Sequence, residues 1–149
     1  MKILFVCRGN MFRSQVAEAL FKCKHQSVKH RVFNTLVRSC GTWVEKEGLT
    51  GKKLRDFDGV NAPWNLNNVV EVMKEKGIDI SENTCKPITP ELVNWADKII
   101  SMAEVNESPD YLLNSPKVTF WNVENPDNFT KELARELIEK IEKLVSICI

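Results

Sequence analysis

A cysteine and an arginine stand six positions apart near the start of the sequence, at Cys7 and Arg13, and Ser14 follows directly. A cysteine thiolate is a nucleophile, and a guanidinium binds two oxygens of a phosphoryl group through its planar fork. A serine hydroxyl beside the sulfur stabilises it as an attacking group and later as a leaving group. These residue types therefore indicate nucleophilic chemistry on an anionic group.

The residues between the cysteine and the arginine have the composition of an anion-binding loop. Gly9 and Asn10 are residue types that tolerate positive φ values, so successive backbone N–H groups can turn inward as a nest. A helix that begins directly after the loop adds its positive N-terminal end. The predicted phosphate-binding residues are Arg8, Gly9, Asn10, Met11, Phe12 and Arg13.

Neighbouring segments strengthen this interpretation. A cysteine and an arginine at this spacing also occur by chance, and a cysteine near a strand end is usually a core residue. Here the loop follows a continuous apolar run at Lys2–Val6, which is typical of a buried parallel strand. From Ser14 onward the apolar residues recur at helical spacing. The loop is thus expected at the carboxyl end of a strand, where open α/β sheets bind ligands.

The rest of the chain alternates between predicted strands and helices. Proline at the first helical position and threonine as N-cap predict a helix start at Thr89-Pro90. Other predicted strands are residues 31–39, 97–102 and 117–121, and other predicted helices are residues 67–76 and 130–145. This alternation predicts an α/β fold, a single-domain three-layer sandwich whose four-stranded, mostly parallel sheet carries helices on both faces.

The whole chain, residues 1–149, has the length of one ordinary domain. Residues 42–63 show little periodicity and many charges, so they are expected to form a surface insertion with room for a short helix. The opening apolar run is too short for a signal peptide, and no stretch reaches membrane-spanning length. We therefore expect a cytoplasmic protein.

Charge and cysteine usage exclude several classes of partner. The formal net charge is +1, so no general basic field favours nucleic acid or a membrane surface. The five cysteines are scattered and odd in number, unlike a disulfide framework. With no CxxC pair and only two histidines, a metal site is not expected. The composition leaves the oligomeric state open.

The run from Val6 to Ala19 resembles the low-molecular-weight protein tyrosine phosphatase superfamily, which includes the thioredoxin-coupled arsenate reductases. Residues 39–42, 72–81 and 96–102 are similar to further segments of that superfamily. The resemblance implies a cysteine-dependent phosphatase that hydrolyses phosphomonoesters, such as phosphotyrosine-like aryl phosphates, through a cysteinyl-phosphate on Cys7. It implies that Arg13 binds the phosphoryl oxygens, Asn10 holds the loop shape and Ser14 supports the thiolate. The implied partner is a phosphorylated protein or a small phosphomonoester, and no cofactor is expected.

The position of the family's general acid departs from this pattern. The family has an aspartate directly before a proline in a loop after the last strand, and Asn125 stands there in this chain. Asparagine cannot transfer a proton, and loss of a general acid typically costs 10²–10⁴-fold in rate. Glu124 or Asp127 is the candidate replacement. Otherwise both are solvated loop residues, and activity is weak and confined to good leaving groups.

Two other positions bear on the substrate. Arg8 adds a positive charge to the loop, which either favours an acidic or doubly anionic substrate or simply faces solvent. Trp43 lies where family members line the pocket, so we predict that it forms the substrate pocket together with Asn125. Trp64, Trp95 and Trp121 are assigned to packing. Phe12 replaces the family's second loop cysteine, so a protective disulfide with Cys7 is not expected.

Two other functions stay open. Ser14-Gln15 resembles the arsenate reductase branch, but the reductase relay needs two further cysteines after the third strand. None occurs between Cys85 and Cys148, which favours the phosphatase. A phosphate- or phosphoprotein-binding module with weak turnover is the other alternative. Asn125 supports it, and the intact Cys7, Arg13 and Ser14 speak against it.

Overall fold

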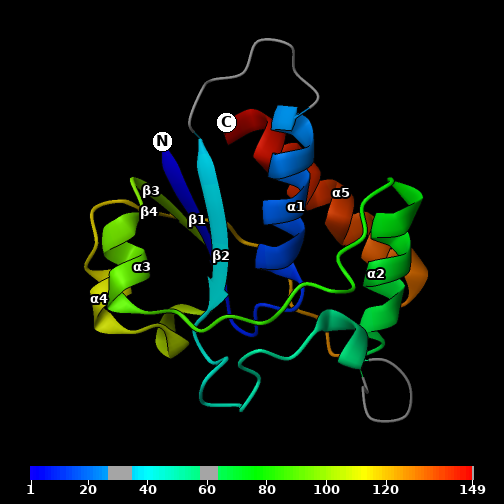
Figure 1. The fold of residues 1–149 in the computed structure, drawn as a ribbon, viewed down its shortest axis with the longest axis horizontal. Helices are drawn as coiled ribbons and strands as arrows, with labels where there is room; N and C mark the ends of the chain where they lie inside the picture. The colour runs from blue at the N-terminus through cyan, green and yellow to red at the C-terminus, as the bar shows by residue number, and fades with distance from the viewer. Residues whose placement is uncertain (27–34, 58–63, 149) are drawn as a thin grey trace.

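The computed structural model describes residues 1–26, 35–57 and 64–148 (Figure 1). Its sheet has four parallel strands in the order β2-β1-β3-β4. The strands are β1 (Lys2–Cys7), β2 (Leu36–Gly41), β3 (Lys98–Ser101) and β4 (Val118–Phe120). Because all four run parallel, their carboxyl ends meet at one edge of the sheet.

Helices cover both faces of this sheet, as Figure 1 shows. The helices on one face are α1 (Arg13–Gln26), α2 (Leu66–Glu75) and α5 (Lys131–Cys148). The helices on the other face are α3 (Pro90–Trp95) and α4 (Asp110–Leu113). The predicted three-layer sandwich is therefore confirmed, and the sheet is parallel throughout.

Strand β1 lies in the middle of the core and supplies both of its halves. Ile3, Phe5 and Cys7 belong to the apolar cluster under α1, α2 and α5. Leu4 and Val6 belong to the cluster under α3 and α4. All five side chains are at most 2% exposed, so the continuous apolar run is explained by a strand buried on both faces.

The predicted elements are present, and apart from the start of the second strand their ends shift by at most three residues. Strand β1 extends to Cys7, and α1 begins at Arg13 rather than at Ser14. Thr89 caps α3 as predicted, because its Oγ1 accepts a hydrogen bond of 3.1 Å from the backbone N–H of Leu92. The second strand begins at Leu36, and residues 31–34 of its predicted range lie outside the described residues.

The segment after β2 is anchored in the core more firmly than a surface loop. It contains a 3₁₀ helix, η1 (Leu54–Phe57), where a short helix was predicted. Val44, Leu49, Leu54 and Phe57 are buried in the same cluster as Cys7. Residues 58–63 of the predicted insertion lie outside the described residues. The described part of this segment can therefore hold side chains firmly at the edge of the sheet.

A short 3₁₀ helix, η3 (Val105–Glu107), follows β3 at the same edge and was not predicted. Among the described residues, no helix combines the length and the apolar character needed to cross a bilayer.

Candidate active site

In the loop between β1 and α1, positive φ is found at one of the two positions where the residue types predict it. Asn10 has a φ of 51°, in the left-handed region. Gly9 was predicted to share this feature, but it is not among the residues with positive φ. Glycine is instead demanded at Gly41 of β2, where a Cβ would lie 2.5 Å from the carbonyl oxygen of Arg8. Strand β2 thus approaches the loop so closely that only glycine fits.

Cys7, the predicted nucleophile, is held by a buried hydrogen-bond network. The Sγ of Cys7 lies 2.9 Å from the Oγ of Ser14. Asn10 donates from its Nδ2 to the same Oγ at 2.8 Å and to the Oγ of Ser39 at 3.0 Å. Since the Ser14 oxygen accepts from Asn10, its own hydrogen is free to point at the sulfur. That orientation stabilises a thiolate.

The far side of the network fixes this direction. Ser39 donates to the carboxylate of Glu18 at 2.7 Å, so its oxygen is left to accept from Asn10. Gln15 donates from its Nε2 to the Oδ1 of Asn10 at 3.1 Å, and the backbone N–H of Lys86 donates to the same oxygen at 2.9 Å. The Asn10 amide is therefore held in one orientation, and from its Nδ2 hydrogen bonds are donated in both directions, through Ser39 to Glu18 and through Ser14 to the sulfur.

The loop also offers free backbone donors. Within the described ranges, no protein acceptor receives a hydrogen bond from the backbone N–H of residues 9–12. Buried or half-buried N–H groups normally find a partner, so a run of open donors beside a helix start indicates an anion site. Gly9, Met11 and Phe12 line the cavity into which this loop opens. The arrangement matches the predicted phosphate cradle, whose occupation by phosphate stays a prediction.

Arg13 is anchored along one side of its guanidinium. Its Nη1 donates to the carbonyl oxygens of Met102 and Val123 and lies 3.0 Å from the Oε1 of Glu104. Its Nε is buried without a protein partner. The Nε edge of the guanidinium is thus left to bind oxygens of a ligand. Its Nη1 edge is bound by residues that follow β3 and by the 121–129 loop.

Glu104 is a component of the site that sequence reasoning missed. Burial alone would raise the pKa of its carboxyl, but the hydrogen bond and positive charge of Arg13 outweigh burial and lower the pKa. One signal was available in the sequence: Glu104 comes three residues after β3, at the sheet edge where ligands bind. The missing information was the contact with Arg13, 91 positions away in the chain.

Arg8 does not face free solvent. Its guanidinium lies 3.3 Å from the carboxylate of Glu47 and 3.5 Å from that of Glu107. It also lies 4.2 Å from the centre of the Trp43 ring, and the Nζ of Lys46 lies 4.3 Å from the same centre. Two cations therefore contact the Trp43 ring, and this residue is not among those that line the cavity. Its predicted place in the substrate pocket is not supported.

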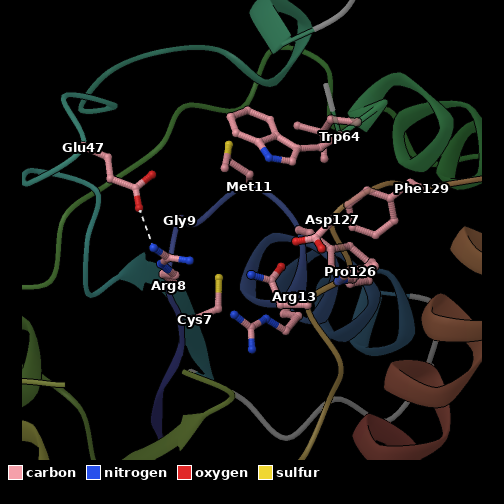
Figure 2. Close-up of a pocket in the computed structure, with 13 residues that line it drawn as sticks. Cys7, Arg8, Gly9, Met11, Arg13, Glu47, Trp64, Pro126, Asp127 and Phe129 are labelled. Carbon is pink, nitrogen blue, oxygen red and sulfur yellow. Dashed lines mark ion pairs between the residues drawn. The ribbon is translucent and has the colours of Figure 1, made fainter. Parts of the chain in front are cut away.

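The cavity above Cys7 measures about 110 Å³ and combines charged and apolar walls. Figure 2 shows the sulfur of Cys7 at its floor, with Met11, Trp64 and Phe129 along one wall. Trp64, which the sequence assigned to packing, lines the cavity while its ring also lies 6.3 Å from that of Phe57. Residues 58–63, which precede it, lie outside the described residues.

The three candidate residues of the acid loop, Glu124, Asn125 and Asp127, differ in whether they line the cavity. Asn125 and Asp127 line the cavity together with Pro126. Glu124 is exposed and is not among the lining residues. Figure 2 shows Asp127 on the wall beside Pro126 and Phe129, across the cavity from Glu47. The structure therefore brings one carboxylate of the predicted pair to the site and leaves the other outside.

The other described cysteines do not line the cavity. Cys40 and Cys85 are buried free thiols, and Cys23 is exposed. Burial and the nearby negative charge of Cys7 raise the pKa of Cys85 to about 12, and the same two causes raise that of Cys40. Both are therefore protonated and unreactive near neutral pH. In the part of the chain that the structure describes, no group of three acidic, histidine or cysteine side chains could hold a metal ion.

Comparison with known proteins agrees with this geometry. The family described as low molecular weight phosphotyrosine protein phosphatase matches residues 2–55. An arsenate reductase of Bacillus licheniformis is 35% identical over 100 residues, which cover 67% of this chain and 55% of the relative. A protein-arginine-phosphatase of Bacillus subtilis is 34% identical over 103 residues, which cover 68% of this chain and 55% of the relative. The matched region thus spans about half the length of these two relatives.

A solved structure matches over nearly the full chain. It is the low molecular weight protein tyrosine phosphatase from T. tengcongensis, with a TM-score of 0.71 and 26% identity. The match covers 98% of this chain and 95% of that one. The family match begins in β1 and includes the whole loop from Cys7 to Ser14. By sequence and by structure, the chain belongs to the superfamily of low molecular weight protein tyrosine phosphatases and arsenate reductases.

Proposed function

We propose that this protein is a cysteine-dependent phosphatase that hydrolyses phosphomonoesters through a cysteinyl-phosphate on Cys7. The observation that carries the proposal is the contact of 2.9 Å between the Cys7 sulfur and the Ser14 hydroxyl, with the hydroxyl turned by Asn10. A cysteine that only packs in the core does not need a hydroxyl hydrogen directed at its sulfur. The unpaired N–H groups of residues 9–12 supply the second requirement, a site for the phosphoryl oxygens.

In the first step, the Cys7 sulfur attacks phosphorus, and the bond between phosphorus and the ester oxygen breaks. The loop N–H groups and the Nε side of Arg13 bind the non-bridging oxygens as their charge shifts in the transition state. A general acid then protonates the departing oxygen. We assign this role to Asp127, because it lines the cavity and Glu124 does not.

In the second step, water attacks the cysteinyl-phosphate and the bond between sulfur and phosphorus breaks. Asp127, now deprotonated, accepts a proton from that water, which returns it to its starting state. The Ser14 hydroxyl stabilises the sulfur as it leaves. No metal or organic cofactor takes part in this scheme.

The apolar wall favours an aryl phosphate as the substrate class. Trp64 and Phe129 offer ring surfaces beside the sulfur, and a phenyl ring gains stacking energy against such a wall. Phosphoarginine is a second class. It is a phosphoramidate, so the bond that breaks is between phosphorus and nitrogen and the leaving nitrogen takes the proton, and the carboxylates of Glu47 and Asp127 line the cavity where its guanidinium would lie. The 34% identical protein-arginine-phosphatase of Bacillus subtilis is named for that substrate. Both classes need Cys7 kept reduced, so we place the protein in the cytoplasm.

Arsenate reduction is the second candidate function. The 35% identical relative of Bacillus licheniformis is named an arsenate reductase, and Ser14-Gln15 resembles that branch. Arsenate has the size and charge of phosphate and fits the same loop. However, Cys40 and Cys85 are buried and protonated and the exposed Cys23 does not line the cavity, so the electrons would have to come from a separate thiol reductant such as glutathione or thioredoxin.

The test is hydrolysis of an aryl phosphate by the purified chain. We expect turnover that Cys7→Ser abolishes and that vanadate inhibits competitively, with Cys23→Ser as the matched control on the exposed side of α1. Phosphate binding without Cys7-dependent turnover at any pH would support a binding module. Arsenate-dependent oxidation of added glutathione or thioredoxin, in the absence of phosphatase turnover, would support the reductase.

A further inference from the structure

Gln15 is a fully buried polar side chain that no step of the proposed reaction uses. It lies in the first turn of α1, where its Nε2 donates to the Oδ1 of Asn10 at 3.1 Å and to the carbonyl oxygen of Thr84 at 2.9 Å. Its Oε1 accepts a hydrogen bond of 3.2 Å from the Nδ2 of Asn83. A buried amide is costly unless its polar atoms are bonded, and an apolar side chain would fill the same space without that cost. The three hydrogen bonds therefore point to a role beyond packing.

The Asn10 amide decides where the hydroxyl hydrogen of Ser14 points. In the observed orientation its Nδ2 donates to the Ser14 oxygen, and its Oδ1 accepts from Gln15 and from the backbone N–H of Lys86. In the reversed orientation Oδ1 would face the Ser14 hydroxyl and accept its hydrogen, so the sulfur of Cys7 would lose that hydrogen. The reversed amide would also turn its own N–H groups toward two other donors. The direction of the Ser14 hydrogen thus depends on what is bonded to the Asn10 oxygen.

Gln15 is itself held in one orientation by two residues of the segment before α3. The Nδ2 of Asn83 faces the Gln15 oxygen and the carbonyl of Thr84 faces its nitrogen, so a reversed Gln15 amide would set donor against donor and acceptor against acceptor. This segment is fixed in turn, because the backbone N–H of Leu54 donates to the carbonyl oxygen of Asn83 at 2.9 Å. Of the two donors to the Asn10 oxygen, Gln15 is the one that belongs to a side chain, so a substitution can remove it.

We propose that Gln15 is a positioning residue for the reaction at Cys7. It fixes the Asn10 amide and thereby turns the Ser14 hydrogen toward the sulfur. This inference rests on the proposed function, because it concerns the group that attacks phosphorus. Gln15 does not line the cavity, so it acts on the sulfur through Asn10 and Ser14. Its removal should therefore lower the reactivity of the sulfur and leave the binding of the phosphoryl group unchanged.

The expected size of the effect follows from the loss of one hydrogen bond in the network. Gln15→Met has nearly the same length and no amide, and it should lower the rate at which iodoacetamide alkylates Cys7 about fivefold. The kcat for an aryl phosphate should fall by the same factor with KM unchanged, because the loop N–H groups keep their positions. Asn83→Ala removes only the hydrogen bond to the Gln15 oxygen and should lower both rates about twofold.

The experiment measures these rates in the parent protein and in a Ser14→Ala background, with the alkylated Cys7 peptide quantified by mass. Because Gln15 acts through Ser14, Gln15→Met should leave the alkylation rate unchanged once the hydroxyl is gone, since residues of one network are not additive. A residue that only supports the fold would lower the rate by the same factor in both backgrounds. Thr89→Ala is the matched control: it removes the cap of α3 on the other face of the sheet, and it should lower the thermal midpoint without changing alkylation.

The outcomes separate this inference from the function on which it rests. An alkylation rate that Gln15→Met leaves unchanged, or lowers equally in the parent and in Ser14→Ala, would overturn the role of Gln15. If Gln15→Met does not fold, Asn83→Ala in the same two backgrounds applies the same test to the same contact. A loss of alkylation that depends on Ser14, together with no turnover of any aryl phosphate, would support the positioning role and overturn the phosphatase function itself.

Discussion

The two halves of the site differ in burial and in the number of their contacts. Cys7 and Arg13 are each 2% exposed and Ser14 is fully buried, and each has at least one hydrogen-bond or ion-pair partner. Asn125 and Asp127 are exposed, and within the described ranges Asp127 makes no hydrogen bond to the protein. The attacking half is thus organised before substrate arrives, whereas the proton-donating half depends on the position of a loop.

The two halves are nevertheless joined. Arg13 donates a hydrogen bond of 3.3 Å to the carbonyl oxygen of Val123, at the start of the acid loop. At the other end of that loop, the rings of Phe12 and Phe129 meet edge to face, with their centres 4.7 Å apart. The residues proposed to bind the phosphoryl group therefore also anchor both ends of the loop that carries the proposed acid.

Replacing the guanidinium should have the largest effect on the attacking half. Arg13→Lys keeps the charge but loses the planar guanidinium. In that guanidinium Nη1 is bonded to the protein, while Nε is left without a protein partner. We expect kcat to fall about 10³-fold, because the interaction is made with the transition state. The control is Arg135→Lys, a pair with Glu75 on the exposed surface. Near-parental kcat in Arg13→Lys would show that the fork is not used.

The proton-donating half is tested by leaving-group dependence. Asp127→Asn should lower kcat about 10²-fold on an alkyl phosphate, whose oxygen needs a proton, and only a few-fold on a nitrophenyl phosphate. Glu124→Gln is the matched control, since this exposed neighbour does not line the cavity. Equal rates in both variants on the alkyl phosphate, with a gain in Asn125→Asp, would mean that the enzyme works without a protein acid.

Removal of the directed hydroxyl should have an intermediate effect. In Ser14→Ala the Cys7 sulfur loses the hydrogen bond of 2.9 Å, and a bond to a charged group contributes about 2 kcal/mol. We expect kcat/KM to fall about thirtyfold. Ser39→Ala breaks the network one hydrogen bond further away and should cost only about threefold. A larger loss in Ser39→Ala than in Ser14→Ala would contradict the proposed direction of the network.

The smallest effect concerns the ion pair between Arg13 and Glu104. Because the pKa of Glu104 is lowered in the folded protein, the pair stabilises the fold above the unfolded pKa of about 4.3. That contribution is lost as pH falls through the lowered pKa. Glu104→Gln should therefore lower the free energy of unfolding at pH 7, by at most about 1 kcal/mol after solvent screening, with the difference shrinking as the pH falls below the unfolded pKa and vanishing below the lowered one. Urea unfolding across this range measures it, and a difference that grows toward low pH would exclude the pair as its source.

The attacking half could be predicted from the sequence because its parts are neighbours in the chain. The types of Cys7, Arg13 and Ser14 and the flanking apolar pattern define a strand, a loop and a helix within fewer than thirty residues of one another. The same local patterns predicted the sheet and the cap at Thr89. Local composition is informative where the contacts are local.

Contacts between distant segments could not be predicted in this way. Glu47 and Trp64 line the cavity and Glu104 pairs with Arg13, each from a different segment, and nothing in their local sequence marks them as partners of the loop. Trp43 was predicted in the pocket because it follows residues 39–42, where family members line the pocket, but the Arg8 and Lys46 cations lie over its ring. Side-chain direction at the end of a strand depends on packing that a single sequence does not display.

The central claim is that Cys7 carries the phosphoryl group during turnover. Rapid acid quench of the protein in the presence of an aryl phosphate, followed by mass analysis of its peptides, tests this directly. We predict a mass increase of one phosphoryl group on the peptide that contains Cys7, with none in Cys7→Ser. Continued turnover with no phosphorylated Cys7 peptide, or with the group on another residue, would contradict the account.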